Sequence, residues 1–376
     1  MTASRLQQLH DAGQSLWLDY IDRTMLYDGS LQRRIREDAL TGMTSNPSIF
    51  EKALAEGHAY DSELAAAKAD RTPWQLFEMV ETSDVRRACE IFAEVYGATQ
   101  GGDGYVSIEV SPGVAHDAAA TVEEGRRLWQ TVGRPNVMIK VPGTAEGAKA
   151  VRQLIADGIN VNVTLLFSIA AHQRVIEAYI DAIEERVNKG LPVDRIASVA
   201  SFFVSRVDSE IDKRLDAKIA AGGDRAALDA LKGKAAIANA KMAYALFRRL
   251  FAGPRWERLA AAGAHVQRPL WASTSTKNPA YRDVRYVEAL IAPHTVNTMP
   301  NATIDAFRDH GEVRGDTAME DVAGARRAIE TLGDLGMSLT ELTDQLLVEG
   351  VEKFSKAFNQ MIQAVGEKLG RVAQRT

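Results

Sequence analysis

Lys140 is the residue whose surroundings point most directly to chemistry. It stands inside the apolar run VMIKVP, which is typical of a buried strand. Burial disfavours the ammonium form of a lysine and favours the free amine, which attacks carbonyl carbons. The run therefore predicts a lysine that forms a Schiff base with a ketone. The alternative is a structural lysine neutralised by Glu109 or Asp19, and we rank it lower because buried ion pairs are a poor source of stability.

Polar residues alternate with apolar ones in the segments near this lysine. Asn160, Asn162 and Thr164 share one face of the expected strand INVNVTLL, and Ser107 and Glu109 share one face of GYVSIEV. A buried polar group without a partner destabilises a fold, and an isolated buried charge does so far more. Stability alone therefore does not explain these residues, and we expect an active site at the ends of neighbouring strands.

Two carboxylates are candidates for moving protons. Asp19 ends an expected strand and could donate and accept the proton that C–C cleavage requires, although a helix cap or loop carboxylate is an equal alternative. Glu109 could act through a water held by Thr164, and its alternative role is a salt bridge to Lys140. Asn46, in TSNPSIF, could bind a substrate hydroxyl or cap the helix that follows.

Positive and hydroxyl groups follow two later strands. Arg206 comes directly after SFFVS, and Ser273 and Lys277 lie in WASTSTKNP. Such groups at the C-terminal rim of a barrel predict a phosphate site, although each cation alone could be a hydrated surface charge. Lys277 is also a rival nucleophile, but its polar, turn-rich surroundings should keep it hydrated and protonated. We therefore prefer Lys140.

Eight short β-branched runs, each followed by helix-forming sequence, must position these residues. Their alternation predicts an α/β fold of the closed (β/α)8, or TIM barrel, type. A doubly wound open sheet is the rival, but the sequence holds no GxGxxG or Walker motif. The expected strands are 15–20, 40–46, 104–110, 136–142, 159–166, 196–204, 269–275 and 294–299.

The chain is predicted to form one barrel domain over residues 1–376, with two additions. Residues 205–265 are long enough for a helical insertion of two or three helices after the sixth strand. The periodicity of residues 317–376 predicts a helical C-terminal extension. This tail could pack across a barrel mouth or serve an oligomer interface, and the sequence leaves both open.

Composition limits the partners. A net charge of −5 with a pI near 5.9 gives no basic footprint for nucleic acid. No apolar run is long enough to cross a membrane, the N-terminus does not resemble a signal peptide, and a single cysteine fits a reducing compartment. The seven histidines form no HxH or HExxH pattern, so no metal is expected. We therefore expect a cytoplasmic protein.

Six motifs in this order resemble those of the transaldolases, in particular the longer bacterial subgroup. They are TSNPSIF, VSIEVSP, VMIKVPGTAEG, NVNVTLLFS, SFFVSRVD and WASTSTKNPAY, within about residues 15–300. The resemblance implies a cofactor-free transferase of the non-oxidative pentose phosphate pathway, with sugar phosphates as partners. Such an enzyme moves a dihydroxyacetone unit from sedoheptulose 7-phosphate to glyceraldehyde 3-phosphate, giving erythrose 4-phosphate and fructose 6-phosphate.

The resemblance also implies a role for each matching residue. Lys140 would be the nucleophile, Asp19 the proton donor and acceptor, and Glu109 and Thr164 would hold the catalytic water. Asn46, Asn162 and Ser201 would contact substrate hydroxyls or the Schiff base. Arg206 and Ser273 would bind phosphate. Phe203 would line the pocket. One departure is that shorter transaldolases carry an arginine just after the strand-seven serine, where this chain has Thr274-Ser275-Thr276-Lys277. Lys277 could replace that arginine.

Two other functions fit the same residues. One is a class I (Schiff-base) aldolase acting on another keto-sugar phosphate, and the other is a non-catalytic barrel that binds sugar phosphates. Related aldolases that release free dihydroxyacetone tend to carry other residues at the positions of Glu109 and Phe203. The resemblance therefore favours transfer over release. A homo-oligomer is possible on any of these interpretations.

Overall fold

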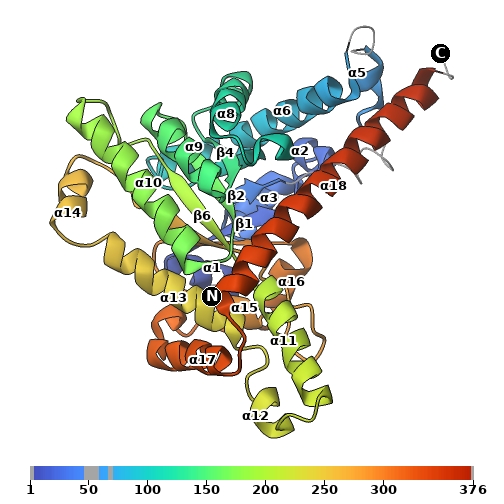
Figure 1. The fold of residues 1–376 in the computed structure, drawn as a ribbon. Coiled ribbons are helices and arrows are strands. Elements are labelled where there is room, and N and C mark those ends of the chain that lie inside the picture. The colour runs from blue at the N-terminus through green and yellow to red at the C-terminus, as the bar shows by residue number, and fades with distance from the viewer. Residues whose placement is uncertain (1–3, 46–58, 67–70, 374–376) are drawn as a thin grey trace.

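The computed structural model describes residues 4–45, 59–66 and 71–373, and Asn46 lies outside them. Eight parallel strands pair in chain order and close into a barrel, so the predicted (β/α)8 fold is confirmed. Seven of the strands begin and end within two residues of their predicted runs, and the strand predicted over 269–275 ends three residues earlier, at Ala272 (Figure 1). The strands are β1 (Gln14–Asp19), β2 (Leu40–Thr44), β3 (Tyr105–Glu109), β4 (Val137–Pro142), β5 (Val161–Leu166), β6 (Ser198–Phe203), β7 (Arg268–Ala272) and β8 (Thr295–Met299).

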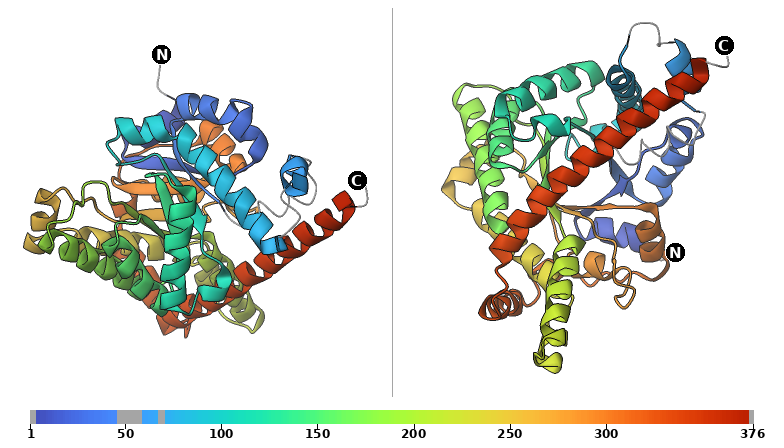
Figure 2. Two further views of the ribbon diagram at one scale, coloured as in Figure 1. Left: turned by 90° about the horizontal axis from the view of Figure 1, so that it is seen from above. Right: turned by 45° about the vertical axis from the view of Figure 1, so that its right-hand side comes forward.

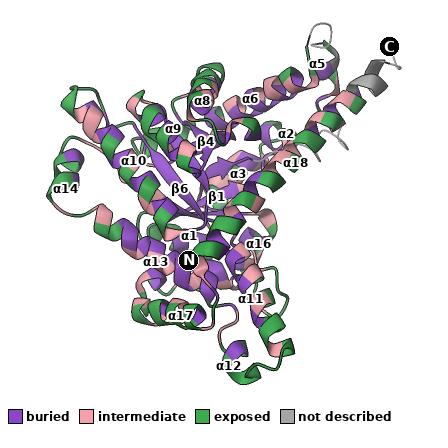
Figure 3. Cartoon of the chain, in the orientation of Figure 1, coloured by how far each residue is buried: buried purple, intermediate pink, exposed green. Residues whose placement is uncertain are grey.

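The helices surround this barrel and bury its outer face. Figure 3 shows the strands buried and the outward sides of the helices exposed, as burial of apolar area requires. Ser168 caps α10 by accepting from the backbone N–H of Ala171, and Gly190 follows the end of this helix at φ +66°. The helices outside the two additions are α1 (Arg5–Asp11), α2 (Arg23–Tyr27), α3 (Ser30–Glu37), α5 (Asp61–Ala66), α6 (Pro73–Ile91), α7 (Ala93–Ala98), η2 (Pro112–Val114), α8 (Ala118–Val132), α9 (Ala145–Ala156), α10 (Ile169–Asn188), α15 (Arg285–Ala289) and α16 (Asn301–His310).

The barrel interior is filled by side chains from alternate strand positions. Trp17, Met138, Val199 and Leu270 pack there in one apolar cluster. Gly42 makes room for the indole, because a Cβ at this position would lie only 2.5 Å from the ring of Trp17. The next inward positions on β1, β4 and β6, toward the C-terminal ends of the strands, are Asp19, Lys140 and Ser201, so the apolar layer lies beneath these polar residues.

Residues 205–265 form four helices rather than the two or three expected. They are α11 (Ser205–Ala220), α12 (Arg225–Asp229), α13 (Ala235–Leu250) and α14 (Pro254–Ala261). The short α12 accounts for the difference, because Asp224 accepts from two backbone N–H groups and starts a turn that periodicity over five residues could not reveal.

The C-terminal extension forms η3 (Thr317–Met319), α17 (Val322–Asp334) and the 35-residue α18 (Leu339–Ala373). Figure 1 and the right-hand view of Figure 2 show α18 running straight across the barrel. It packs on α5, α6, η2 and α11 and touches the end of β5. Of the two roles that the sequence left open, packing across the barrel mouth is the one observed.

Candidate active site

A cavity of about 440 Å³ opens at the C-terminal ends of the strands. Nine of the residues singled out from the sequence as catalytic or substrate-binding line this cavity, although they lie between Asp19 and Lys277 in the chain. The cavity wall from the barrel consists of Asp19, Thr44, Glu109, Lys140, Thr164, Leu165, Ser201, Phe203, Arg206, Ala272, Ser273, Ser275, Lys277, Thr298 and Pro300.

Lys140 and Glu109 form the centre of this cavity. They are register partners on β4 and β3, and Lys140 Nζ lies 2.8 Å from Glu109 Oε2. Their side chains are 12% and 7% exposed, so the pair is nearly dry, and Nζ also lies 3.4 Å from the carbonyl oxygen of Ser45. The ion pair offered as the alternative role of both residues is therefore present in the structure.

Burial shapes the chemistry of Glu109. Desolvation raises the pKa of its carboxyl, the ammonium of Lys140 acts in the opposite direction, and the charge of Asp19 raises it further. A carboxylate with a raised pKa is a better proton acceptor than a hydrated one. Glu109 is thus placed to exchange a proton with the neighbouring amine.

Asp19 lies at the C-terminal end of β1 and faces the same cavity. Thr44 Oγ1 donates to Asp19 Oδ1 at 3.0 Å and lies 2.8 Å from Thr298 Oγ1. This chain of hydroxyls from β2 and β8 fixes the carboxylate on the cavity side, and Asp19 caps no described helix. The described helix that follows β1, α2, has Asp22 as its N-cap.

The polar residues of β5 and β6 occupy two levels. Asn162 is fully buried and does not line the cavity: its Nδ2 donates to Ser107 Oγ at 2.9 Å, and its Oδ1 accepts from Ser201 Oγ at 2.7 Å. Ser201 and Thr164 do line the cavity. Within the described part of the chain, the hydroxyl of Thr164 makes no hydrogen bond. Asn160, at the far end of β5, bonds three backbone groups and is structural.

Cations gather at the β6 and β7 side of the cavity. The guanidinium of Arg206 lies 5.0 Å from the ring centroid of Phe203 and has no ion-pair partner among the described residues. Burial lowers the pKa of Arg206, while the charges of Asp19 and Glu349 oppose that shift. Lys277 also lines the cavity, and its Nζ donates to Ser275 Oγ at 2.9 Å.

Ser273 joins this cationic side to the start of α11. It adopts φ +57°, its carbonyl accepts from the backbone N–H of Ser205 at 3.0 Å, and the two hydroxyls lie 2.9 Å apart. A non-glycine residue in this conformation is strained and is found mainly where surrounding structure requires it. Ser273 therefore presents its hydroxyl beside the positive end of a 16-residue helix.

Four residues of α18 complete the cavity, and the sequence did not single them out. Gly350, Lys353, Phe354 and Ala357 line it from above. Their spacing places them on one helical face, which was the only sequence signal available. Periodicity marks such a face but does not say which element it meets.

Membrane-spanning helices and clusters of metal-binding side chains are both absent from the described residues. No helix there is long and apolar enough to cross a bilayer. In the same ranges, no three His, Cys, Asp or Glu side chains gather as a metal site would require.

A closed barrel with a lysine paired to a carboxylate at its C-terminal rim, and a second carboxylate in the same cavity, defines a (β/α)8-barrel enzyme equipped for carbonyl chemistry. The sequence profile of the transaldolase/fructose-6-phosphate aldolase family matches residues 16–365, so the chain belongs to this family. The resemblance to transaldolases is thereby confirmed.

Individual relatives agree with this assignment. The chain is 45% identical to a transaldolase of Trichodesmium erythraeum over 99% of both chains. It is 48% identical to transaldolase 1 of Streptomyces coelicolor, over 98% of this chain and 96% of the relative, and 47% identical to a transaldolase of Mycobacterium leprae over 98% of both. The insertion and the C-terminal extension thus lie within the length that these relatives share.

Proposed function

We propose that the chain is a transaldolase, a transferase that moves a dihydroxyacetone unit from sedoheptulose 7-phosphate to glyceraldehyde 3-phosphate. The products are erythrose 4-phosphate and fructose 6-phosphate. The observation that carries the proposal is the position of Lys140, nearly dry at the cavity floor with Glu109 at 2.8 Å. Family membership and the names of the relatives support the same activity.

The reaction begins when Lys140 loses a proton, for which Glu109 is the adjacent acceptor. The amine then attacks the C2 ketone, and loss of water from the carbinolamine gives an iminium ion. Asp19 takes the proton of the C4 hydroxyl as the C3–C4 bond breaks, and erythrose 4-phosphate leaves. The electron pair of that bond forms a C2–C3 double bond and neutralises the iminium, so the dihydroxyacetone unit stays attached to Lys140 as an enamine.

The second half runs in the opposite direction. The enamine carbon attacks the aldehyde of glyceraldehyde 3-phosphate, and Asp19 returns its proton to the new hydroxyl. A water held by Glu109 and Thr164 then hydrolyses the iminium, which releases fructose 6-phosphate and restores the amine. The hydroxyl of Thr164, which has no hydrogen-bond partner among the described residues, supports this role for a water.

Substrate binding divides between the two sides of the cavity. Ser201 contacts substrate hydroxyls directly, whereas Asn162 acts by holding Ser201 and Ser107, and Asn46 is proposed from sequence resemblance alone. The phosphate binds the guanidinium of Arg206, which has no ion-pair partner in the described ranges, together with the hydroxyl of Ser273 and Lys277. Lys277 takes the part of the arginine found in shorter transaldolases.

Two alternatives share this cavity. An aldolase would release dihydroxyacetone to water, and the cover that α18 gives the cavity opposes such a release. A non-catalytic sugar-phosphate barrel would bind without covalent attachment, and a nearly dry lysine beside a carboxylate gives it no advantage. A cytoplasmic location is proposed from the single buried cysteine, Cys89. A homo-oligomer stays a prediction, which light scattering tests directly.

Borohydride reduction in the presence of fructose 6-phosphate tests the proposal. We expect the Lys140 peptide to gain the mass of a reduced dihydroxyacetone adduct, and Lys140→Met to gain none. Labelling at Lys277 would overturn the site, and absence of any adduct would favour the binding protein. Turnover of fructose 6-phosphate without an aldehyde acceptor would identify an aldolase instead.

A further inference from the structure

The face of α18 above the cavity carries a cation that the proposed reaction has not used. We propose that Lys353 binds the phosphate of the sugar substrates, which makes the C-terminal helix the element that selects phosphorylated over free sugars. This inference rests on the proposed function and extends it to a residue outside the barrel.

The backbone of α18 comes close enough for a side-chain contact with substrate. A Cβ on Gly350 would lie 3.0 Å from Leu165 Cδ2, so only a glycine lets the helix approach the end of β5 without displacing that leucine. Lys353 and Phe354 stand one turn later on the same face and line the cavity. Lys353 therefore lines the cavity next to the position where α18 packs closely on the end of β5.

Contacts on both sides hold α18 in this position. Upstream of Lys353, Gln345 accepts from Arg214 of α11 at 2.9 Å. Downstream, Phe358 packs against Trp74 of α6 with ring centroids 4.9 Å apart, and Lys368 pairs with Asp61 at 2.7 Å. A helix fixed on two sides positions Lys353 with less loss of freedom than a loop would.

Charge at the cavity mouth favours a doubly charged anion. Arg206, Lys277 and Lys353 all line it, and Lys353 Nζ lies 3.3 Å from Glu349 Oε2. That pair is exposed, with side-chain exposures of 65% and 36%, so it is weak and easily exchanged. A phosphate seated against Arg206 offers the ammonium a stronger partner, since hydrogen bonds between charged groups are the strong ones.

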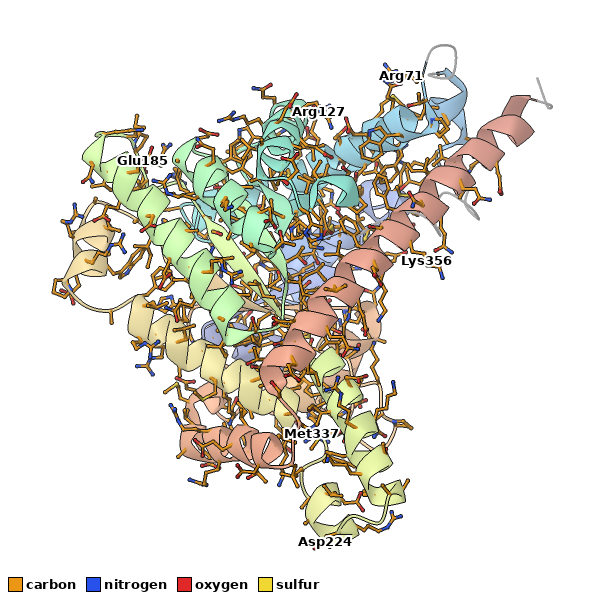
Figure 4. All side chains as sticks on the ribbon, viewed as in Figure 1. Arg71, Arg127, Glu185, Asp224, Met337 and Lys356 are labelled. Atoms are coloured by element: carbon orange, nitrogen blue, oxygen red, sulfur yellow. The ribbon has the colours of Figure 1, made fainter. Side chains whose placement is uncertain are left out.

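Lys356 provides a matched control. It lies on the same helix one turn further on, is exposed, and does not line the cavity; Figure 4 labels it. The test measures the fructose 6-phosphate concentration that gives half-maximal borohydride trapping at Lys140. Dihydroxyacetone, which has no phosphate, is titrated in parallel.

We expect Lys353→Met to raise the half-saturating concentration of fructose 6-phosphate about tenfold. The half-saturating concentration of dihydroxyacetone should stay within about twofold of wild type. The inorganic phosphate concentration needed to compete with fructose 6-phosphate should rise about tenfold, as the sugar phosphate concentration does. Lys356→Met should change none of the three.

An equal change in both variants, or a shift with dihydroxyacetone as large as with fructose 6-phosphate, would overturn the proposal. Circular dichroism of each variant checks that α18 remains folded. Failure of the proposed function itself is a separate outcome, because the wild-type protein would then show no trapped adduct with either sugar.

Discussion

Glu109 and Lys140 occupy paired positions on neighbouring strands, and their charged atoms lie 2.8 Å apart. The pair explains how a lysine can be buried without an uncompensated charge and still react. In the resting protein the carboxylate stabilises the ammonium, and the raised pKa of Glu109 makes the same group a proton acceptor. The same two side chains thus form the ion pair that compensates the buried charge and carry out the proton transfer that frees the amine.

Glu109→Gln should lower kcat about a hundredfold, because the amide keeps the shape of the side chain but cannot accept a proton. Rapid-quench borohydride trapping should show slower formation of the Lys140 adduct. Glu123→Gln, an exposed change on α8, is the control and should match wild type. An unchanged trapping rate in Glu109→Gln would remove Glu109 from the proton transfer.

Asp19→Asn should change which adduct accumulates. Without a base for the C4 hydroxyl, the imine forms but its C3–C4 bond does not break, and kcat should fall by about 10²- to 10⁴-fold. Mass mapping after reduction with fructose 6-phosphate should then find the intact hexose phosphate on Lys140 in place of the dihydroxyacetone unit. Recovery of the three-carbon adduct at the wild-type rate would assign cleavage to another base, and the exposed Asp11→Asn should behave as wild type.

Gly350→Leu should push α18 away from the barrel, since even a Cβ there meets Leu165 Cδ2 at 3.0 Å. We expect destabilisation of about 1–3 kcal/mol and a rise in the KM for sugar phosphates. Gly333→Leu is the matched control, because nothing lies within 4 Å of a Cβ at that position of α17. It should stabilise its helix by about 1 kcal/mol. Thermal melts and KM values that are alike in the two variants would count against the close approach of α18.

His172→Leu should make the fold less sensitive to acid. His172 is fully buried against Phe202, neither ring nitrogen has a hydrogen-bond partner in the described ranges, and burial lowers the pKa of His172 to about 3. The unfolded chain takes up a proton near pH 6.5 while the native one does not, so stability falls as pH drops below 6.5 toward 3.

The loss attributable to His172 is about 2 kcal/mol at pH 5. Denaturant unfolding at pH 7.5 and pH 5 should therefore show a smaller drop for His172→Leu than for wild type. His265→Leu, at a partly exposed position, gives the comparison for a histidine whose ring is accessible to water. Equal acid sensitivity of His172→Leu and wild type would mean that His172 is protonated in the native state.

The sequence was informative wherever a pattern has a fixed period. Strand alternation placed Asp19, Glu109, Lys140 and Thr164 on inward faces, and the parallel barrel brought those ends together. The same alternation could not show which inward residues reach the cavity. Asn162 shares a face with Thr164, yet it lies below the cavity, and its amide N–H and oxygen are hydrogen-bonded to Ser107 and Ser201.

Contacts between distant elements lay beyond such patterns. The apolar surroundings of Lys140 predicted burial, and Glu109 and Asp19 were both candidate partners. Which of the two pairs with Lys140 depends on strand register, which short runs do not specify. Lys353 and Lys356 look equivalent in the sequence. Only the packing of α18 on β5 and α6 determines which of the two faces the cavity.

The cavity is walled by Asp19 from the first strand and by Ala357 from α18. During synthesis, a chain that has reached the end of β8 already holds every barrel group of the site, but its mouth stands open to water. The last part of the chain to be synthesised therefore supplies the cover of the site, whereas the proposed reactive groups come from barrel strands that precede it.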